Sequence, residues 1–267
     1  MTASPELERK PGSTKGELGV AFDLPGGPDA VLLLHGLTGT PFEVSQVAGR
    51  LNARGLRCRG PLLPGHGGHP RALLGLSWPS WVEGARRELF ALSGARRTYL
   101  VGCSMGALVA CELARVFPER VHGLALLAPA FRLRMPGRLA GFLAQRTALP
   151  RLWPLWPKLG GSDVRDPDMR RANPCMSALP LAAVGTLCQF ARHLEPHLSE
   201  IAAPVLMVLG GHDHTVSSAG ALRLSRRVGR SPCRVIVLER SYHLVGIDVE
   251  RERCADAVAR FFEELAA

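Results

Sequence analysis

A serine between small residues carries the clearest chemical signal in this sequence. Residues 102–106 read Gly-Cys-Ser-Met-Gly, which is the spacing G-x-S-x-G. They lie between a short β-branched and aromatic segment, residues 97–101, and an apolar helical segment, residues 107–117, that stops before Pro118. A strand, a turn of this kind and a helix expose the serine hydroxyl at the carboxyl end of a sheet. The context therefore predicts a nucleophilic Ser104 rather than an ordinary glycine–serine turn.

The two partners that such a serine needs each have a candidate later in the chain. A base must take the proton of the hydroxyl, and a carboxylate must hold the tautomer of that base. Asp213 follows the apolar run 205–209, and His243 follows the apolar run 234–238. We therefore expect Ser104, Asp213 and His243 to act together. Asp248 is the alternative acid, although its position favours capping of the last helix.

The neighbours of Asp213 allow a second interpretation. His212, Asp213 and His214 could be read as a metal-binding cluster, but no H-E-x-x-H motif or other ligand set accompanies them. We expect both histidines to be loop residues and expect neither a metal site nor an organic cofactor.

The chemistry of Ser104 also requires hydrogen-bond donors for a developing oxyanion. The backbone N–H of Met105, directly after the nucleophile, is one candidate. The other is the N–H of Leu37 in residues 35–39, His-Gly-Leu-Thr-Gly, where glycines let the backbone approach a substrate. We expect His35 itself to have a structural role, bonding neighbouring loops.

The elements that must position these residues alternate along the chain. We expect strands at residues 30–35, 56–59, 97–101, 121–127, 205–209 and 234–238, and helices at 41–54, 80–94, 107–117, 217–228 and 249–265. Thr40 to Glu43 resembles a capping box with proline at the first helical position. Near-continuous apolar strands alternating with helices predict a mostly parallel α/β sheet covered on both faces.

One segment interrupts this alternation. From about residue 131 to 200 no strand is evident, and the sequence is rich in leucine, arginine and proline, with Trp153 and Trp156. Since it follows a sheet strand, we expect a helical cap over the carboxyl ends of the strands, roofing an acyl pocket, within one domain over residues 1–267. Ordinary packing helices are the alternative.

Composition excludes several classes of protein. The net charge is +10, but 30 of the 33 basic residues are arginines spread along the chain, and no nucleic-acid-binding motif is present. We therefore expect no nucleic-acid partner; a membrane surface has no local support beyond the two tryptophans and the arginines.

Seven scattered cysteines indicate reduced thiols rather than a disulfide framework. Residues 1–16 are polar, with no apolar secretory core, so we expect a loose lead-in and a cytoplasmic protein.

Five ordered motifs together resemble the α/β-hydrolase superfamily, and most of all small bacterial carboxylesterases and monoacylglycerol-lipase-like enzymes. These are residues 35–39, Pro-Gly-His-Gly at 64–67, residues 102–106, Gly-x-x-Asp-x-x-Val at 210–216 and Ser-Tyr-His at 241–243. The resemblance covers about residues 17–265. It implies an α/β-hydrolase fold, a structural role for His66 beside the pocket, and hydrolysis of short- to medium-chain esters or monoacylglycerols. Ala107, where many relatives carry glycine, is a small departure.

Other activities remain open on the same residues. A lipase or lysophospholipase acting at a lipid surface is one, and thioester hydrolysis, carbon–carbon bond hydrolysis or acyl transfer are others. A non-catalytic ligand-binding protein on a hydrolase scaffold is the alternative of another class. Dehalogenases and epoxide hydrolases are excluded, because they need a carboxylate where Ser104 stands.

Overall fold

A seven-stranded sheet forms the centre of the computed structural model, which describes residues 19–229 and 233–267. The strand order is β1-β3-β2-β4-β5-β8-β9, and only β1 runs antiparallel to its neighbour. The strands are β1 (Phe22–Leu24), β2 (Asp29–Leu34), β3 (Arg57–Gly60), β4 (Arg97–Cys103), β5 (Gly123–Leu127), β8 (Val205–Gly210) and β9 (Arg234–Leu238). The predicted lead-in, residues 1–16, lies outside the described residues.

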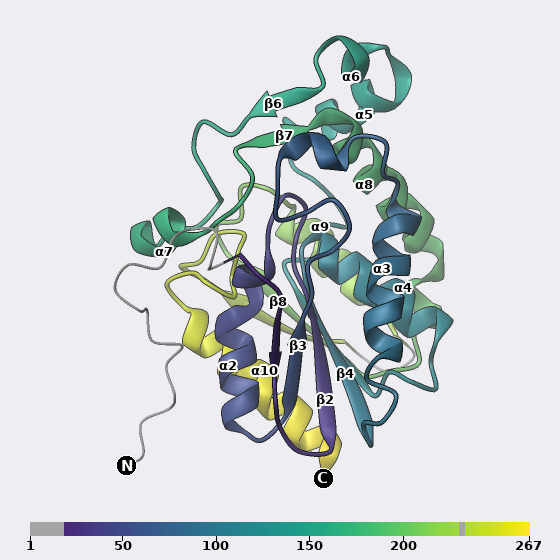
Figure 1. Cartoon of the computed structure of the whole chain (residues 1–267), viewed down its shortest axis with the longest axis vertical. Helices are drawn as coiled ribbons and strands as arrows, with labels where there is room; N and C mark the ends of the chain where they lie inside the picture. Colours follow the sequence, from purple (N-terminus) through teal and green to yellow (C-terminus); the bar gives the residue numbers. More distant parts are fainter. Residues whose placement is uncertain (1–18, 230–232) are drawn as a thin grey trace.

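Helices cover both faces of the sheet (Figure 1). One face carries α2 (Ser45–Ala53) and α10 (Arg251–Ala266); the other carries α3 (Trp78–Phe90), α4 (Met105–Val116) and α9 (Ser218–Ser225). Successive β2 side chains point to opposite faces, so Leu32 and Leu34 pack in one core cluster while Val31 and Leu33 pack in the other. The predicted α/β-hydrolase fold, with a mostly parallel sheet covered on both sides, is confirmed.

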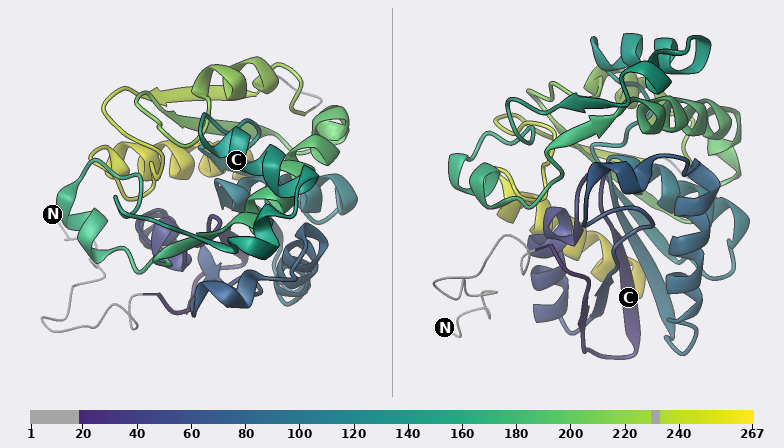
Figure 2. Two further views of the ribbon diagram at one scale, coloured as in Figure 1. Left: turned by 90° about the horizontal axis from the view of Figure 1, so that it is seen from above. Right: turned by 45° about the horizontal axis from the view of Figure 1, so that its top comes forward.

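The segment between β5 and β8 leaves the sheet and lies over one end of it (Figures 1 and 2). This insertion, residues 131–200, contains α5 (Gly137–Arg146), α6 (Leu149–Leu152), α7 (Pro167–Ala172) and α8 (Leu181–Leu194), with the 3-10 helix η3 (Glu195–Glu200). It also contains β6 (Leu155–Pro157) and β7 (Ala178–Pro180), an antiparallel pair. The expectation of no strand here was wrong, because three-residue strands that contain prolines give no period-two pattern.

The predicted capping box was also wrong. Residues 41–54 form a 3-10 turn, η1 (Pro41–Val44), before α2, and the Thr40 side chain makes no cap bond. The Glu43 carboxylate instead accepts the backbone N–H of Gly36 at 2.8 Å. A 3-10 turn, η2 (Pro70–Leu73), precedes α3. Within the two described ranges, no helix combines the length and apolarity needed to cross a membrane.

Candidate active site

Ser104 occupies a strained turn between β4 and α4. Its backbone has φ 53° and ψ −111°, a positive φ that side chains other than glycine seldom adopt. A Cβ on Gly106 would lie 2.2 Å from the carbonyl oxygen of Leu34, and one on Gly102 would lie 2.4 Å from the carbonyl oxygen of Gly106. Small residues on both sides are therefore required for α4 to fold back tightly onto the sheet.

The structure brings the three predicted side chains into one hydrogen-bonded chain. His243 Nε2 lies 2.9 Å from Ser104 Oγ, and His243 Nδ1 lies 2.8 Å from Asp213 Oδ2. All three residues are buried. An Nδ1–H donor to Asp213 leaves Nε2 as the acceptor that faces the serine hydroxyl.

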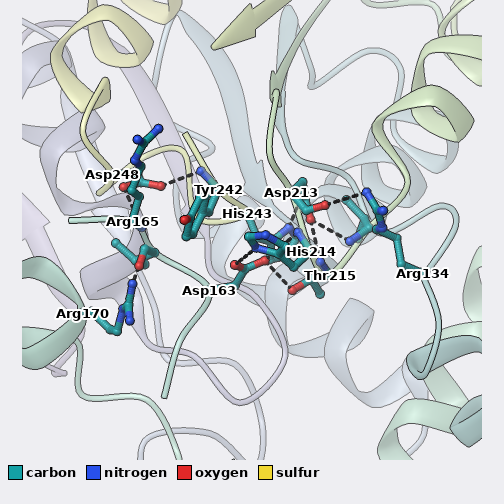
Figure 3. A network of polar contacts seen from close by, with 12 residues as sticks. Arg134, Asp163, Arg165, Arg170, Asp213, His214, Thr215, Tyr242, His243 and Asp248 are labelled. Atoms are coloured by element: carbon teal, nitrogen blue, oxygen red, sulfur yellow. Dashed lines mark hydrogen bonds and ion pairs between the residues drawn. The ribbon is translucent and has the colours of Figure 1, made fainter. Parts of the chain in front are cut away.

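Backbone N–H groups of its own loop hold the Asp213 carboxylate in place. Its second oxygen, Oδ1, accepts the N–H groups of Thr215 at 2.8 Å and Val216 at 2.7 Å. Arg134, from the start of the insertion, donates through Nη1 to the backbone carbonyl of Asp213 at 3.1 Å (Figure 3). These bonds set the direction of the carboxylate before it meets His243.

The pKa of His243 is raised above its ordinary value. Burial is the largest single influence and lowers it, because a charged imidazole loses hydration, but the nearby carboxylates together outweigh that effect, chiefly Asp213 by charge and by hydrogen bonding. Asp163 and Glu43 raise the pKa further. The site therefore favours the imidazolium form that a proton-accepting histidine must pass through.

Residues 35–39 form a loop directly beside Ser104. A Cβ on Gly36 would lie 3.2 Å from the Cβ of Ser104. His35 Nε2 accepts the N–H of Leu63 at 3.0 Å, and its Nδ1 lies 2.9 Å from the Gly36 carbonyl. Burial lowers the pKa of His35 to about 3. The histidine is thus held neutral as a bridge between two loops, in agreement with its predicted structural role.

His66 lies in the neighbouring loop, as predicted. Its ring centroid is 4.8 Å from that of His35, and burial lowers its pKa to about 4. Its Nδ1 lies close to the carbonyl oxygens of Leu63 and Pro64. His66 therefore supports the loop that His35 bonds, rather than reaching Ser104.

Glu43 holds the loop 35–39 in place through its buried carboxyl group. Burial raises the pKa of its carboxyl group, whose oxygen accepts the Gly36 N–H. A Cβ on Gly39 would lie 2.2 to 2.5 Å from the Glu43 carboxyl atoms, so glycine is required there. Among the described residues, neither the N–H of Leu37 nor that of Met105 donates to another protein group.

The insertion is hydrogen-bonded to the loop 35–39 at Thr38, a residue with φ 62°. Lys158 Nζ donates to Thr38 Oγ1 at 2.6 Å, and the N–H of Met176 donates to the Thr38 carbonyl at 2.9 Å. The two contacts come from opposite arms of the β6–β7 pair. The position of the insertion is therefore coupled to the loop beside Ser104.

The insertion also contacts the acid and histidine loops through Asp163. Its carboxylate accepts the N–H of His214 and the hydroxyl of Thr215, each at 3.0 Å, and pairs with His214 Nδ1 at 2.9 Å (Figure 3). Its backbone carbonyl accepts the N–H of Leu244 at 3.1 Å. His214 is therefore a loop residue, as predicted, and is held by a carboxylate from the insertion.

Asp248 does not cap the last helix, which begins at Arg251 after Glu250. Its buried carboxylate accepts four backbone N–H groups: those of Arg165, Asp166, Tyr242 and Val249. It thereby joins the insertion to the segment just before His243 (Figure 3). The prediction of a cap was wrong because the partners of Asp248 lie up to 83 residues away in the sequence.

A cavity of about 460 Å³ opens onto Ser104 and His243. The insertion supplies most of its apolar wall, including Leu133, Leu139, Leu143, Leu149, Val184 and Leu187. Thr38, Lys158, Ser162, Asp163 and His214 line a more polar part of the wall. The volume lies within the range of roughly 300–1,000 Å³ typical of small-molecule sites.

Other reactive groups near the site are accounted for. Cys103 precedes Ser104, but burial raises the pKa of its thiol well above the ordinary value, so it is not a competing thiolate. All seven cysteines are unpaired thiols. In the described part of the chain, no group of three or more histidine, cysteine, aspartate or glutamate side chains could hold a metal ion.

Four contributors to the site were missed by sequence reasoning: Glu43, Arg134, Lys158 and Asp163. Glu43 carried a signal, since a glutamate within one turn of the loop 35–39 can reach back to it, but it also fitted a capping box. The other three belong to the insertion and act on loops 51 to 120 residues away. No local pattern reveals such contacts.

The fold and this arrangement of serine, histidine and carboxylate define an α/β-hydrolase. The family model described as serine aminopeptidase, S33, matches residues 28–250, and the chain belongs to this family.

Characterised relatives are similar over most of the chain. Thermostable monoacylglycerol lipase of Bacillus sp. (strain H-257) is 26% identical over 241 residues, covering 90% of this chain and 92% of the lipase. Pimeloyl-(acyl-carrier protein) methyl ester esterase of Aeromonas hydrophila is 32% identical over 243 residues, covering 81% of this chain and 89% of the esterase.

Solved structures of lipolytic enzymes share the fold. A structure from the metagenome-derived lipolytic enzymes LipS and LipT has a TM-score of 0.83 at 22% identity, covering 92% of this chain and 98% of its own. The monoacylglycerol lipase of Paleococcus ferrophilus has a TM-score of 0.77 at 18% identity, covering 92% and 98%. The chain is therefore a hydrolase of the esterase and lipase group of α/β-hydrolases.

Proposed function

We propose that this protein is a serine carboxylesterase that cleaves short- to medium-chain esters or monoacylglycerols through an acyl-enzyme on Ser104. The observation that carries the proposal is the hydrogen-bonded chain from Ser104 Oγ through His243 to Asp213, at the floor of a largely apolar cavity. The similarity to a monoacylglycerol lipase and to a methyl ester esterase supports ester substrates.

The first half-reaction forms the acyl-enzyme. Ser104 Oγ attacks the ester carbonyl while His243 Nε2 takes its proton and Asp213 stabilises the imidazolium. The N–H groups of Leu37 and Met105 bind the oxyanion; their lack of a protein acceptor among the described residues supports this role. His243 then protonates the alcohol as it leaves. In the second half-reaction, His243 activates a water that releases the acid and frees Ser104.

The insertion acts as a cap that determines which acyl chains bind. Its leucines provide the apolar wall, so each added methylene that stays inside the cavity is worth roughly 0.8 kcal/mol, up to about fourfold in kcat/KM. Activity should therefore rise with chain length and then fall once the cavity is filled.

A series of p-nitrophenyl esters, from acetate to long chains, tests this function in the wild type and in Ser104→Ala. We expect a maximum at short or medium chains and a loss of roughly 10⁴-fold or more in the variant. A wild type no faster than Ser104→Ala on every ester would contradict the proposal and favour carbon–carbon bond hydrolysis or ligand binding. A maximum at long chains, above the concentration at which they aggregate, would indicate a lipase.

A further inference from the structure

The outer surface of the insertion concentrates exposed apolar side chains. Of the twelve large hydrophobic side chains exposed among the described residues, seven lie between residues 135 and 159. We use the name apical patch for five of them, all from the segment 142–159: Phe142, Leu152, Trp153, Trp156 and Leu159. Leu152 is 80% exposed and Leu159 is 96% exposed, so neighbouring side chains shield them very little. An apolar concentration of this kind usually marks an interaction site.

The same stretch of chain carries only positive charge. Residues 133–162 contain Arg134, Arg138, Arg146, Arg151 and Lys158, and no aspartate or glutamate. Within the described ranges, Arg138, Arg146 and Arg151 have no carboxylate within ion-pair distance. Arginines elsewhere do, among them Arg50, Arg54, Arg57, Arg59, Arg86 and Arg87. The charge around the apical patch is therefore available to an external anionic surface.

The patch lies at the end of the molecule that bears the cavity. Helix α6 lies at the top of the molecule in Figure 1, and the insertion stands above the sheet in the turned view of Figure 2 as well. Met135, Leu139 and Trp156 are exposed and also line the cavity, so exposed apolar surface continues into the site. A surface bound at the apex would face the cavity.

We propose that the apical patch docks the protein on a negatively charged phospholipid bilayer, with the cavity turned toward the lipid. Tryptophan side chains are enriched at the boundary between lipid headgroups and acyl chains, and two of them are exposed here. The neighbouring arginines would pair with anionic headgroups. Projecting side chains such as Leu152 and Leu159 can enter a fluid bilayer without a matching surface, whereas an acidic protein partner would need pockets complementary to each. The inference extends the proposed function, but the binding itself does not require ester hydrolysis.

Sedimentation with lipid vesicles tests the docking. The protein is mixed with phosphatidylcholine vesicles, with or without phosphatidylglycerol, and the bound fraction is measured at low and high salt. We expect binding to the vesicles that contain phosphatidylglycerol, weakened by salt. Leu152→Ser with Leu159→Ser should lower the partition coefficient at least tenfold. The matched control is Val116→Ser with Leu222→Ser, two exposed apolar residues outside the insertion, which should leave it unchanged.

The charge contribution needs its own control, because the whole chain is basic. Arg146→Gln with Arg151→Gln should weaken partitioning roughly fivefold per arginine. Arg223→Gln with Arg226→Gln, exposed on or beside α9, removes the same charge and should have a much smaller effect. Hydrolysis of a soluble short-chain ester and the thermal midpoint should be unchanged in all four variants.

Two results would overturn the docking proposal. One is a wild type that does not sediment with the anionic vesicles, which would turn attention to an acidic protein partner. The other is an equal loss of binding in the patch variants and their controls, which would indicate adsorption by overall charge. Since sedimentation with vesicles reports binding and does not depend on catalysis, failure of the docking proposal is distinct from failure of the proposed esterase activity.

Discussion

The charges around His243 decide at which pH the site can work. A histidine that takes a proton from Ser104 must be neutral, so activity is present above the pKa of His243 and is lost as the pH falls through it. Asp213, Asp163 and Glu43 all raise this pKa, which places the acidic limb of the pH profile above the ordinary histidine value. Asp163 contributes from the insertion, through charge rather than through a bond to His243.

Asp163→Asn should therefore shift the acidic limb to lower pH. The amide has nearly the same shape but no charge, so the imidazolium form of His243 loses one source of stabilisation. The measurement is kcat/KM against pH on a soluble ester. Asp256→Asn is the control: it removes a carboxylate of α10 that pairs with Arg50 of α2, and it should leave the limb in place. An unchanged or raised midpoint in Asp163→Asn would contradict this account.

At the scale of elements, the loop between β2 and η1 is shaped by one buried carboxylate. Glu43 accepts the Gly36 N–H, and Gly39 leaves the space that the carboxylate fills. The loop therefore presents Leu37 to the cavity from a fixed position. The turn at Ser104 and this loop meet at the carboxyl ends of the neighbouring strands β4 and β2.

Gly39→Ala should disturb this arrangement. The new methyl group would meet the Glu43 carboxyl group, so we expect a loss of about 1–3 kcal/mol in the free energy of unfolding. If Leu37 moves with the loop, kcat should fall by up to roughly 10²-fold, the cost typical of one lost oxyanion donor. Gly49→Ala in α2 is the control: its Cβ meets nothing within 4 Å, and it should stabilise by about 0.5–1 kcal/mol. Denaturant unfolding and ester kinetics check both, and equal behaviour of the two variants would refute the role of Gly39.

The elements that sequence reasoning located well are those with local signals. The apolar runs at 205–209 and 234–238 became β8 and β9. Strand β8 is buried at every residue, as a continuous apolar sequence predicts, whereas β9 is mostly half-buried at the edge of the sheet. Residues 102–106 gave the turn, since the glycines and the flanking segments are adjacent in sequence. The β6–β7 pair and the role of Glu43 could not be predicted, because each depends on contacts that only the folded chain creates.

At the scale of the whole molecule, the candidate site is assembled from distant parts of the chain. Ser104 comes from the centre of the sheet, Asp213 and His243 from loops after its last two strands, and the cavity wall from the insertion. Bonded contacts tie the insertion to this site at several points. They run through Arg134, Lys158, Asp163, Met176 and Asp248. The order of Ser104, Asp213 and His243 along the chain made these residues predictable. The hydrogen bonds between the insertion and the site have no sequence signature.

The central claim is that Ser104 is the nucleophile, and covalent trapping tests it most directly. The wild type is treated with an alkyl p-nitrophenyl phosphonate, which mimics the tetrahedral intermediate and stays attached, and the intact protein and its peptides are weighed. We predict one phosphonyl group per chain, located on Ser104, with release of one p-nitrophenolate, and no adduct in Ser104→Ala. An adduct on another residue such as Cys103, or equal labelling of the wild type and Ser104→Ala, would contradict the account.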